Sequence, residues 1–188
     1  MKIIGFAGKK GAGKDTCAAY MQRCIVVGME GDNRITTLAF ATPLKRALST
    51  IFYENFPETE EGKESDIPGF DFTWRYAAQH IGTDCLRAMD TDIWVKHMQK
   101  ELAWYSRQSC THALITDVRF PNEVDLIQHL NGHVIYVMRE GKDGDRHSSE
   151  NAIGAMECDS VILNNGTKDE LIQTVNNVYK TMKGMHYV

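Results

Sequence analysis

A short glycine-rich segment near the N-terminus restricts the possible folds of this chain more than any other feature. Gly8, Gly13 and Lys14 match the pattern GxxxxGK. The segment follows the apolar run 3–7, which is typical of a buried strand, and precedes a helical pattern at 14–26. In such a unit the glycines let backbone amides surround phosphate oxygens, while the lysine and the helix N-terminus add positive charge. We therefore predict a phosphate-binding loop; a purely structural glycine turn is the alternative.

The residue after the lysine departs from the usual pattern of such loops. A serine or threonine normally stands there and binds Mg²⁺ through its hydroxyl, whereas this chain has Asp15, followed by Thr16. A carboxylate is also a hard oxygen ligand that suits Mg²⁺, directly or through water. We predict that Asp15 binds the metal and that Thr16 contacts an inner phosphate. The alternative is that Asp15 only complements the helix dipole.

Five short apolar strands separated by helical segments predict an α/β fold with a parallel sheet covered on both faces. We expect the strands at 3–7, 35–40, 113–116, 133–138 and 160–163. We expect the helices at 14–26, 42–51, 74–89, 92–107, from 121 onward and at 168–182, with Thr42 as an N-cap. The helical stretch between the second and third strands is too long for one crossover, so it predicts a subdomain at 41–110 within a single domain of 188 residues. The acidic segment 54–72 is expected to be a solvated loop.

The composition is that of an ordinary globular protein, with 43% hydrophobic and 24% charged residues. A formal net charge of −4 argues against the binding of polymeric nucleic acid through a broad basic face. No apolar run approaches the roughly 20 residues of a membrane span, and the first residues predict a strand rather than a signal peptide. The five cysteines lack CxxC spacing, which indicates a reducing, cytoplasmic environment without a disulfide framework, and no zinc-site spacing is present.

A phosphate-binding loop does not by itself identify a reaction, so other polar segments decide between classes of protein. A GTPase switch would need DxxG directly after a strand and a later NKxD; the strand at 113–116 ends instead in DVRF, and no NKxD occurs. Asp117 lies at the carboxyl end of that strand, where ligands collect in open α/β sheets. We predict that Asp117 positions Mg²⁺ through water or accepts hydrogen bonds from the acceptor, and that Arg119 lies near the transferring phosphoryl group. Asn122 and Glu123 lie at the start of the next helix. They are candidates for the same site as Asp117 and Arg119, and capping of the helix is the alternative role.

The segment after the fourth predicted strand is rich in glycine and charge. It contains Arg139 and Arg146, and we expect a lid at 139–152 that closes over the phosphates and brings its arginines to the transition-state charge. A plain surface loop is the alternative. A phosphate loop, cationic groups for an acceptor phosphate and a lid with arginines are the three parts that a small-molecule kinase needs.

Several sequences carry a resemblance that runs in order from residue 3 to about residue 172. They are GKKGAGKDT at 8–16, FATPLKRAL at 40–48, QHIGTDCLR at 79–87 with Trp94 nearby, DVRFPNE at 117–123, RHSSE at 146–150 and NNGT at 164–167. Together, and including the unusual aspartate after the lysine, they resemble the phage deoxynucleoside monophosphate kinases. The loop alone is also similar to that of the animal-type phosphomevalonate kinases.

The resemblance implies a three-layer P-loop NTPase fold with a five-stranded parallel sheet, a helical insertion that binds the nucleoside monophosphate, and a short lid. It implies ATP-dependent phosphorylation of deoxynucleoside monophosphates to diphosphates, with Mg²⁺ accompanying ATP. The implied catalytic residues are Lys14, Asp117, Arg119, Arg139 and Arg146. The implied ATP-binding residues are Gly11, Ala12, Gly13, Lys14, Asp15, Thr16, Asn165, Gly166 and Thr167. The implied acceptor-binding residues are Lys10, Phe40, Lys45, Trp74, Gln79, Gly82, Thr83, Arg87, Trp94, Asp117, Arg119 and Glu123.

Some of these implied roles have structural alternatives. Lys10, Lys45, Arg87 and Arg119 are placed around the acceptor phosphate by the resemblance, and Phe40, Trp74 and Trp94 are candidates to stack on the base. Ordinary core packing is the alternative for Phe40 and Trp94. Asn165 to Thr167 are expected to frame the adenine of ATP through backbone groups, and an N-cap is the alternative for Thr167.

Two other functions remain open from the sequence. The first is a P-loop kinase for another small phosphorylated metabolite, such as dephospho-coenzyme A or phosphomevalonate. The second is a non-catalytic nucleotide-binding regulatory domain, which would be expected to have lost the arginines and Asp117 that this chain retains. Small nucleotides are the expected partners, membranes and polymeric nucleic acid are not, and a homodimer is expected if the chain forms an oligomer.

Overall fold

The computed structural model describes residues 1–28, 34–141 and 157–185. The chain divides into two units: the first comprises Met1–Ala39 and Gln99–Val188, and the second comprises Phe40–Met98. Helix α5 (Ile93–Arg107) runs through the boundary between them. Within the part of the chain that is described, no helix is both long and apolar enough to cross a membrane.

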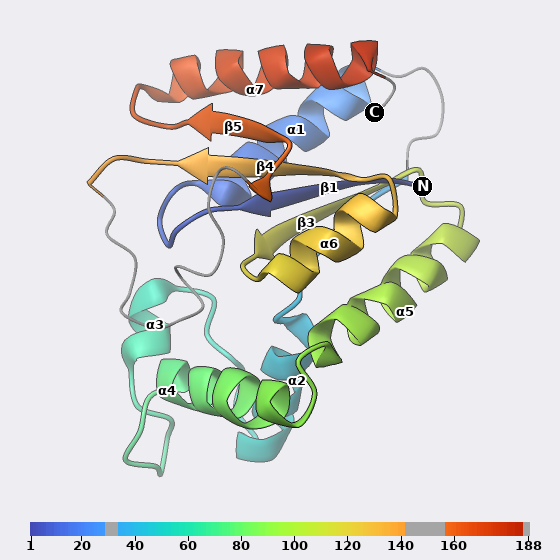
Figure 1. Ribbon diagram of the computed structural model, residues 1–188. Helices are drawn as coiled ribbons and strands as arrows, with labels where there is room; N and C mark the ends of the chain where they lie inside the picture. Colours follow the sequence, from blue (N-terminus) through green and yellow to red (C-terminus); the bar gives the residue numbers. More distant parts are fainter. Residues whose placement is uncertain (29–33, 142–156, 186–188) are drawn as a thin grey trace. The chain divides into compact units, whose positions relative to one another are not determined.

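A fully parallel, five-stranded sheet forms the framework of the first unit (Figure 1). The strands are β1 (Lys2–Ala7), β2 (Ile35–Leu38), β3 (His112–Val118), β4 (His133–Met138) and β5 (Ser160–Leu163), in the spatial order β2-β3-β1-β4-β5. The predicted α/β fold with five parallel strands is confirmed. Three strands differ in length from the prediction: β1 begins at Lys2 instead of residue 3, and β2 ends at Leu38 instead of residue 40. β3 runs from His112 to Val118 instead of 113–116, so that Asp117 lies within the strand.

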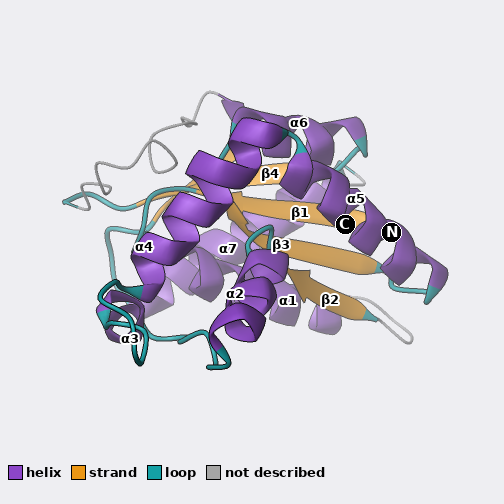
Figure 2. Cartoon of the chain, turned by 90° about the horizontal axis from the view of Figure 1, so that it is seen from below, coloured by secondary structure: helices purple, strands orange, loops and turns teal. Residues whose placement is uncertain are grey.

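Helices cover both faces of this sheet, as Figures 1 and 2 show. They are α1 (Lys14–Gly28), α6 (Pro121–His129) and α7 (Lys168–Gly184). On one face α1 and α7 share a core with the alternate β1 residues Ile4 and Phe6, both fully buried. On the other face a Cβ at Gly5 would touch the Ile127 side chain of α6. Strands that are buried on both faces account for the near-continuous apolar runs in the sequence.

The connections that follow the central strand β1 and its neighbour β3 run to opposite faces of the sheet. β1 continues through the glycine-rich loop into α1, whereas its neighbour β3 continues into α6. In open α/β sheets, ligands bind outside the carboxyl ends of the strands at such a change of direction. The topology therefore brings the glycine-rich loop and the end of β3 to the place where a ligand is expected.

The second unit is helical and has a core of its own. Its helices are α2 (Thr42–Phe52), α3 (Glu60–Glu64), α4 (Trp74–Gln79) and the π-helix η1 (His80–Arg87), followed by the start of α5. Its core cluster consists of the buried residues Leu44, Leu48, Ile67, Trp74 and Ala77. The N-cap of α2 is Ala41 rather than the expected Thr42, which lies with Pro43 inside the first turn. That this unit is a monophosphate-binding insertion stays a prediction.

The helix expected at 74–89 is divided into α4 and η1. Gly82 lies in the π-helix, where a Cβ would collide with the Leu44 side chain of α2. The Trp94 indole Nε1 donates a hydrogen bond to the Gly82 carbonyl oxygen at 3.1 Å. Helical periodicity in the sequence predicts a helix here but cannot distinguish the wider π turn, because that turn depends on contacts with two other helices.

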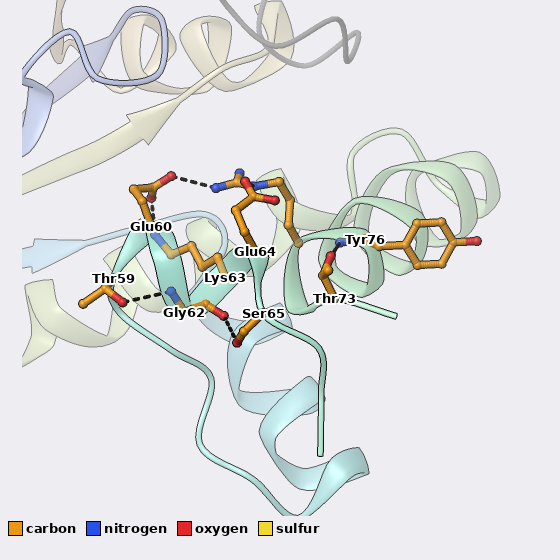
Figure 3. A network of polar contacts seen from close by, with 9 residues as sticks. Thr59, Glu60, Gly62, Lys63, Glu64, Ser65, Thr73 and Tyr76 are labelled. Carbon is orange, nitrogen blue, oxygen red and sulfur yellow. Dashed lines mark hydrogen bonds and ion pairs between the residues drawn. The ribbon is translucent and has the colours of Figure 1, made fainter. Parts of the chain in front are cut away.

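The expectation of a solvated loop at 54–72 is wrong for part of that segment. Residues 60–64 form α3, and the Thr59 hydroxyl caps its N-terminus (Figure 3). The Glu60 carboxylate binds Arg75 of α4 at 2.7 Å, and Glu64 binds the same guanidinium. Glu60 and Glu64 therefore link α3 to α4 through Arg75. The clustering of acidic residues in the sequence did not indicate this ion-pair partner.

Candidate functional site

The loop between β1 and α1 has a backbone conformation that favours glycine. Gly8, Gly11 and Gly13 have φ values of 135°, 73° and 98°. At Gly8 a Cβ would also collide with the carbonyl oxygen of Val137 in the neighbouring strand β4. The strand, loop and helix therefore follow one another as the sequence pattern predicts, with glycines where the backbone needs them.

Lys14, the first residue of α1, folds back over this loop. Its Nζ donates hydrogen bonds to the carbonyl oxygens of Gly8 at 2.7 Å and Lys9 at 3.0 Å. Asp15 and Thr16 follow in the first helical turn with exposed side chains. The start of a helix offers backbone amides and a positive dipole end. Loop, ammonium group and helix N-terminus thus form an arrangement suited to phosphate.

The register of the sheet brings the ends of four strands to one edge. Ala7 of β1 pairs with Val118 of β3 and with Tyr136 of β4, so the glycine-rich loop begins level with the residues that follow those strands. Met138 of β4 pairs in turn with Leu163 of β5. The candidate residues of the first unit that this edge gathers are Lys10, Lys14, Asp117, Arg119, Arg139 and 164–167.

Glu123, in the first turn of α6, holds the turn that follows β3. Its carboxylate accepts hydrogen bonds from the backbone amides of Arg119 at 2.7 Å and Phe120 at 3.2 Å, and the residue is only 2% exposed. Of the two roles considered from the sequence, capping is the one observed. The carboxylate thereby positions the backbone of Arg119, while direct contact of Glu123 with a substrate stays a prediction.

Asn164, directly after β5, belongs to the sequence NNGT at 164–167, but no pattern in the sequence assigned it a role of its own. Its side-chain Nδ2 donates a hydrogen bond to the carbonyl oxygen of Ala12 in the glycine-rich loop at 2.8 Å. The contact links two segments that are far apart in the sequence. The signal that could have found it is a polar residue immediately after an apolar strand, at the edge where ligands bind.

Asn165 and Thr167 make hydrogen bonds to the segment after β4 and to the first turn of α7, respectively. The Asn165 side-chain oxygen accepts a hydrogen bond from the backbone amide of Glu140 at 2.8 Å. Thr167 is the N-cap of α7, and the Glu170 carboxylate accepts from the Thr167 backbone amide at 2.6 Å. That bond, together with one from the Thr167 hydroxyl, lowers the pKa of the Glu170 carboxyl below its usual value. Contact of 165–167 with an adenine stays a prediction.

The aromatic acceptor-side candidates are packing residues of the second unit. Phe40 and Trp74 are each 4% exposed, and the Trp74 ring lies edge-on to Phe56 with 5.3 Å between the ring centres. Trp94 is half-buried, and its indole nitrogen is held by Gly82. Stacking of these three rings on a base therefore stays a prediction. The burial of Phe40 and the contacts of Trp74 and Trp94 are those of packing residues.

The cationic and polar acceptor-side candidates lie on α2, α4 and η1. Lys45 Nζ lies 5.7 Å from the centre of the Phe56 ring. Arg87 donates a hydrogen bond from Nη1 to the Thr91 carbonyl oxygen at 3.1 Å. One continuous segment, from the last residue of α4 to the end of the π-helix, carries Gln79, Gly82, Thr83 and Arg87. π-helical turns are rare and frequently occur at functional sites.

Arg146 and most of the lid predicted at 139–152 lie outside the described residues. Arg139 is described and is exposed directly after β4. Within residues 1–28, 34–141 and 157–185, no group of three or more His, Cys, Asp or Glu side chains could hold a metal ion. Proteins usually hold Mg²⁺ through one or two carboxylates plus substrate phosphates. The exposed Asp15 carboxylate beside Lys14 fits an ion of that kind.

Known proteins were compared with the chain at the level of sequence family and of structure. Residues 68–175 match the family model described as deoxynucleotide monophosphate kinase. A putative deoxynucleotide monophosphate kinase of Acanthamoeba polyphaga mimivirus is 32% identical over 192 residues, with 93% of this chain and 94% of the relative covered. The deoxynucleotide monophosphate kinase of Enterobacteria phage T4 is 28% identical over 138 residues, with 65% of this chain and 57% of the relative covered. The alignment thus spans little more than half of that phage protein.

Among solved structures, TT1252 from Thermus thermophilus has a TM-score of 0.51 at 14% sequence identity, with 96% of this chain and 97% of that chain covered. At this identity the likeness concerns the fold alone. The family model covers more than half of the chain, and the mimivirus relative exceeds 30% identity over nearly all of it. The chain therefore belongs to the deoxynucleotide monophosphate kinase family of phosphotransferases.

Proposed function

We propose that this protein transfers the γ-phosphoryl group of ATP to deoxynucleoside monophosphates and so produces the diphosphates. The observation that carries the proposal is the glycine-rich loop with Lys14 folded over it, at the same sheet edge as Asp117 and Arg119. Membership of the deoxynucleotide monophosphate kinase family supports the choice of acceptor. Other metabolite kinases and non-catalytic nucleotide-binding domains are the alternatives that the experiments below separate.

On the donor side we assign the ATP phosphates to the loop amides of 11–16 and to the Lys14 ammonium group. The Asn165–Thr167 turn lies at the same sheet edge and is the proposed contact for the adenine. Asp15 would hold Mg²⁺, which when bound neutralises part of the charge on the phosphates. Thr16, next to Asp15 in the first turn of α1, would contact an inner phosphate.

On the acceptor side we assign the monophosphate to four cations. They are Lys10, Lys45, Arg87 and Arg119. The base would be bound by the helical unit, through Gln79, Gly82, Thr83 and the aromatic residues Phe40, Trp74 and Trp94. Arg139 and Arg146 are the proposed lid arginines.

The chemistry needs little from the protein beyond position and charge. An oxygen of the acceptor phosphate attacks the γ-phosphorus, a new P–O bond forms, and the bond to the β-phosphate oxygen breaks, which releases ADP. The attacking oxygen is already anionic, so no strong general base is required. Lys14 and the arginines stabilise the charge that spreads over the transferring group. Asp117 would orient the acceptor or the metal-bound water.

The proposal is tested by a panel assay of ATP with dAMP, dGMP, dCMP, dTMP and the matching ribonucleotides, followed through release of ADP. We expect turnover with at least one deoxynucleotide. Absence of ADP release with every acceptor would contradict the proposal and favour another metabolite kinase. Binding of ATP without any turnover would instead favour a regulatory domain.

The role of Lys14 is tested by its replacement, with a second lysine variant as the control. We expect Lys14→Ala to lower kcat/KM at least about 100-fold, because it removes a charge that stabilises the transition state. The exposed Lys180→Ala on α7 removes the same charge away from the site and should retain activity. Circular dichroism checks that both variants fold. Near-normal turnover of a folded Lys14→Ala protein would refute the assigned role.

A further inference from the structure

Asn164 is a buried residue held by two hydrogen bonds, one from its backbone and one from its side chain. It is 9% exposed, and its backbone amide donates to the Met138 carbonyl oxygen at 2.8 Å, which anchors its backbone to the end of β4. Its side-chain Nδ2 donates to the Ala12 carbonyl oxygen, also at 2.8 Å. Because a backbone carbonyl can only accept, this contact identifies the amide nitrogen rather than the oxygen as the group that faces the loop.

The bond to Ala12 controls the direction of the next backbone amide. The described chain contains no cis peptide bond, so the Ala12 carbonyl and the Gly13 N–H lie in one rigid plane and point in opposite directions. A carbonyl held toward Asn164 therefore turns the Gly13 N–H away from Asn164. In loops of this kind the backbone amides are the groups that bind phosphate oxygens.

The same peptide plane is easy to invert in the absence of a partner. Gly13 has a φ of 98°, and glycine adopts positive and negative φ about equally well. An inverted plane would present the Ala12 carbonyl oxygen to the phosphate, and the two negative groups would repel each other. Asn164 also needs glycine at this position, because a Cβ on residue 13 would lie 2.5 Å from its Nδ2.

We propose that Asn164 is a positioning residue that locks the Ala12–Gly13 peptide in the orientation that binds phosphate. The inference rests on the proposed function in one respect, since it places a polyphosphate in the loop. Asn164 acts through the backbone and has no contact of its own with the nucleotide. β5, the edge strand of the sheet, thereby takes part in forming the donor site.

The experiment compares Asn164→Asp with Asn177→Asp. The first variant keeps the side-chain shape but removes the N–H donor and sets a carboxylate against the Ala12 carbonyl. The second makes the same change on the exposed face of α7. We expect Asn164→Asp to weaken the binding of ATP and of inorganic tripolyphosphate at least about fivefold, the factor that corresponds to loss of one hydrogen bond of about 1 kcal/mol. Calorimetric titration measures both constants.

Three further readouts distinguish positioning from general destabilisation. The Kd for adenosine, which has no phosphate, and the KM for the acceptor should stay within twofold of the unaltered protein. Asn177→Asp should bind tripolyphosphate normally. Unchanged affinity for tripolyphosphate in a folded Asn164→Asp protein would overturn the inference, and so would an equal loss of affinity for adenosine.

A measurement on the unaltered protein covers the case in which Asn164→Asp does not fold. The side-chain amide protons of Asn164 should remain protected from hydrogen exchange when ATP saturates the loop, because the bond to Ala12 is kept in the bound state. Loss of that protection on binding would overturn the inference. Failure of the proposed function looks different: no monophosphate is phosphorylated, while the tripolyphosphate titrations keep their expected pattern.

Discussion

His112 is a buried histidine at the amino end of β3, where it pairs with Lys2 of β1. It is 1% exposed, and among the described residues its Nε2 has no hydrogen-bond partner. Burial lowers its pKa below the usual value, and the positive charges of Lys2 and the chain N-terminus lower it further. The folded protein therefore holds this imidazole neutral at neutral pH.

This lowered pKa predicts a loss of stability at acid pH. Above about pH 6.5 the histidine is neutral in both the folded and the unfolded chain. Below that pH the unfolded chain takes up a proton that the folded chain does not, so the free energy of unfolding decreases as the pH falls. We expect urea unfolding to show a smaller free energy at pH 5.5 than at pH 7.5.

Two variants assign this pH dependence to its source. His112→Gln should reduce the difference between the two pH values, because it removes the titrating group. His129→Gln, on an exposed residue of α6, should leave the difference as it is. A pH dependence that is the same in His112→Gln as in the unaltered protein would contradict the prediction.

For two residues, the chemical type of the side chain does not distinguish substrate binding from helix capping. Glu123 and Thr167 have side chains that could bind a substrate, and both were candidates from the sequence. In the structure the Glu123 carboxylate accepts hydrogen bonds from two backbone amides at the start of α6, and Thr167 caps α7. The same oxygen atoms suit a ligand and a helix N-terminus, so residue type alone does not separate the two roles.

The π-helix η1 has specific contacts with two other helices of its unit. Its Gly82 packs against Leu44 of α2, and the Gly82 carbonyl accepts the indole N–H of Trp94 from α5. π-helices are rare and occur mostly as single turns within α-helices. The Trp94 bond therefore acts as a support for the segment that carries Thr83 and Arg87.

Trp94→Phe tests this support at the level of one hydrogen bond. The phenylalanine ring keeps most of the packing but lacks the N–H donor, so we expect a loss of about 1 kcal/mol in the free energy of unfolding. Trp104→Phe makes the same change on the half-exposed face of α5, where the side chain is 51% exposed, and should have a smaller effect. Equal stability of Trp94→Phe and the unaltered protein, measured by urea unfolding, would show that the bond is dispensable.

At the scale of the whole molecule, each of the two units has a hydrophobic core of its own among the described residues. A core of the first unit lies between the sheet and the helices α1 and α7, whereas the second unit is built around Leu44, Leu48 and Trp74. Local stability differs between regions that have separate cores. A cavity in one core should therefore lower local stability mainly within its own unit.

Leu48→Ala is the corresponding prediction. Leu48 is fully buried, so its truncation leaves a cavity and should cost about 2–5 kcal/mol. Hydrogen exchange should accelerate mainly in residues 40–98, with smaller changes in β1 and β4. Ile51→Ala, a 56% exposed position on the same helix, should change the stability by less than about 0.5 kcal/mol. Equal acceleration in both units after Leu48→Ala would contradict separate cores.

Much of the fold could be predicted because its elements are locally encoded. β4 and β5 have the expected bounds, and α6 and α7 begin at the expected Pro121 and Lys168. Runs of buried apolar residues define strands without reference to the rest of the chain. The division of 74–89 and the helix within 54–72 were not predictable in the same way, because they depend on Leu44, Trp94 and Arg75, which come from other parts of the chain.

The class of fold and the place of the glycine-rich loop could be derived from local patterns, since glycines and an apolar strand leave a signature in neighbouring residues. Which polar groups support that loop depends on the packing of distant segments. Asn164 reaches Ala12 because β5 and β1 end at one sheet edge, and Glu123 is a cap because α6 starts beside Arg119. Hydrogen bonds between distant segments require that both partners be placed by the packed sheet, and no local pattern of residues specifies that meeting.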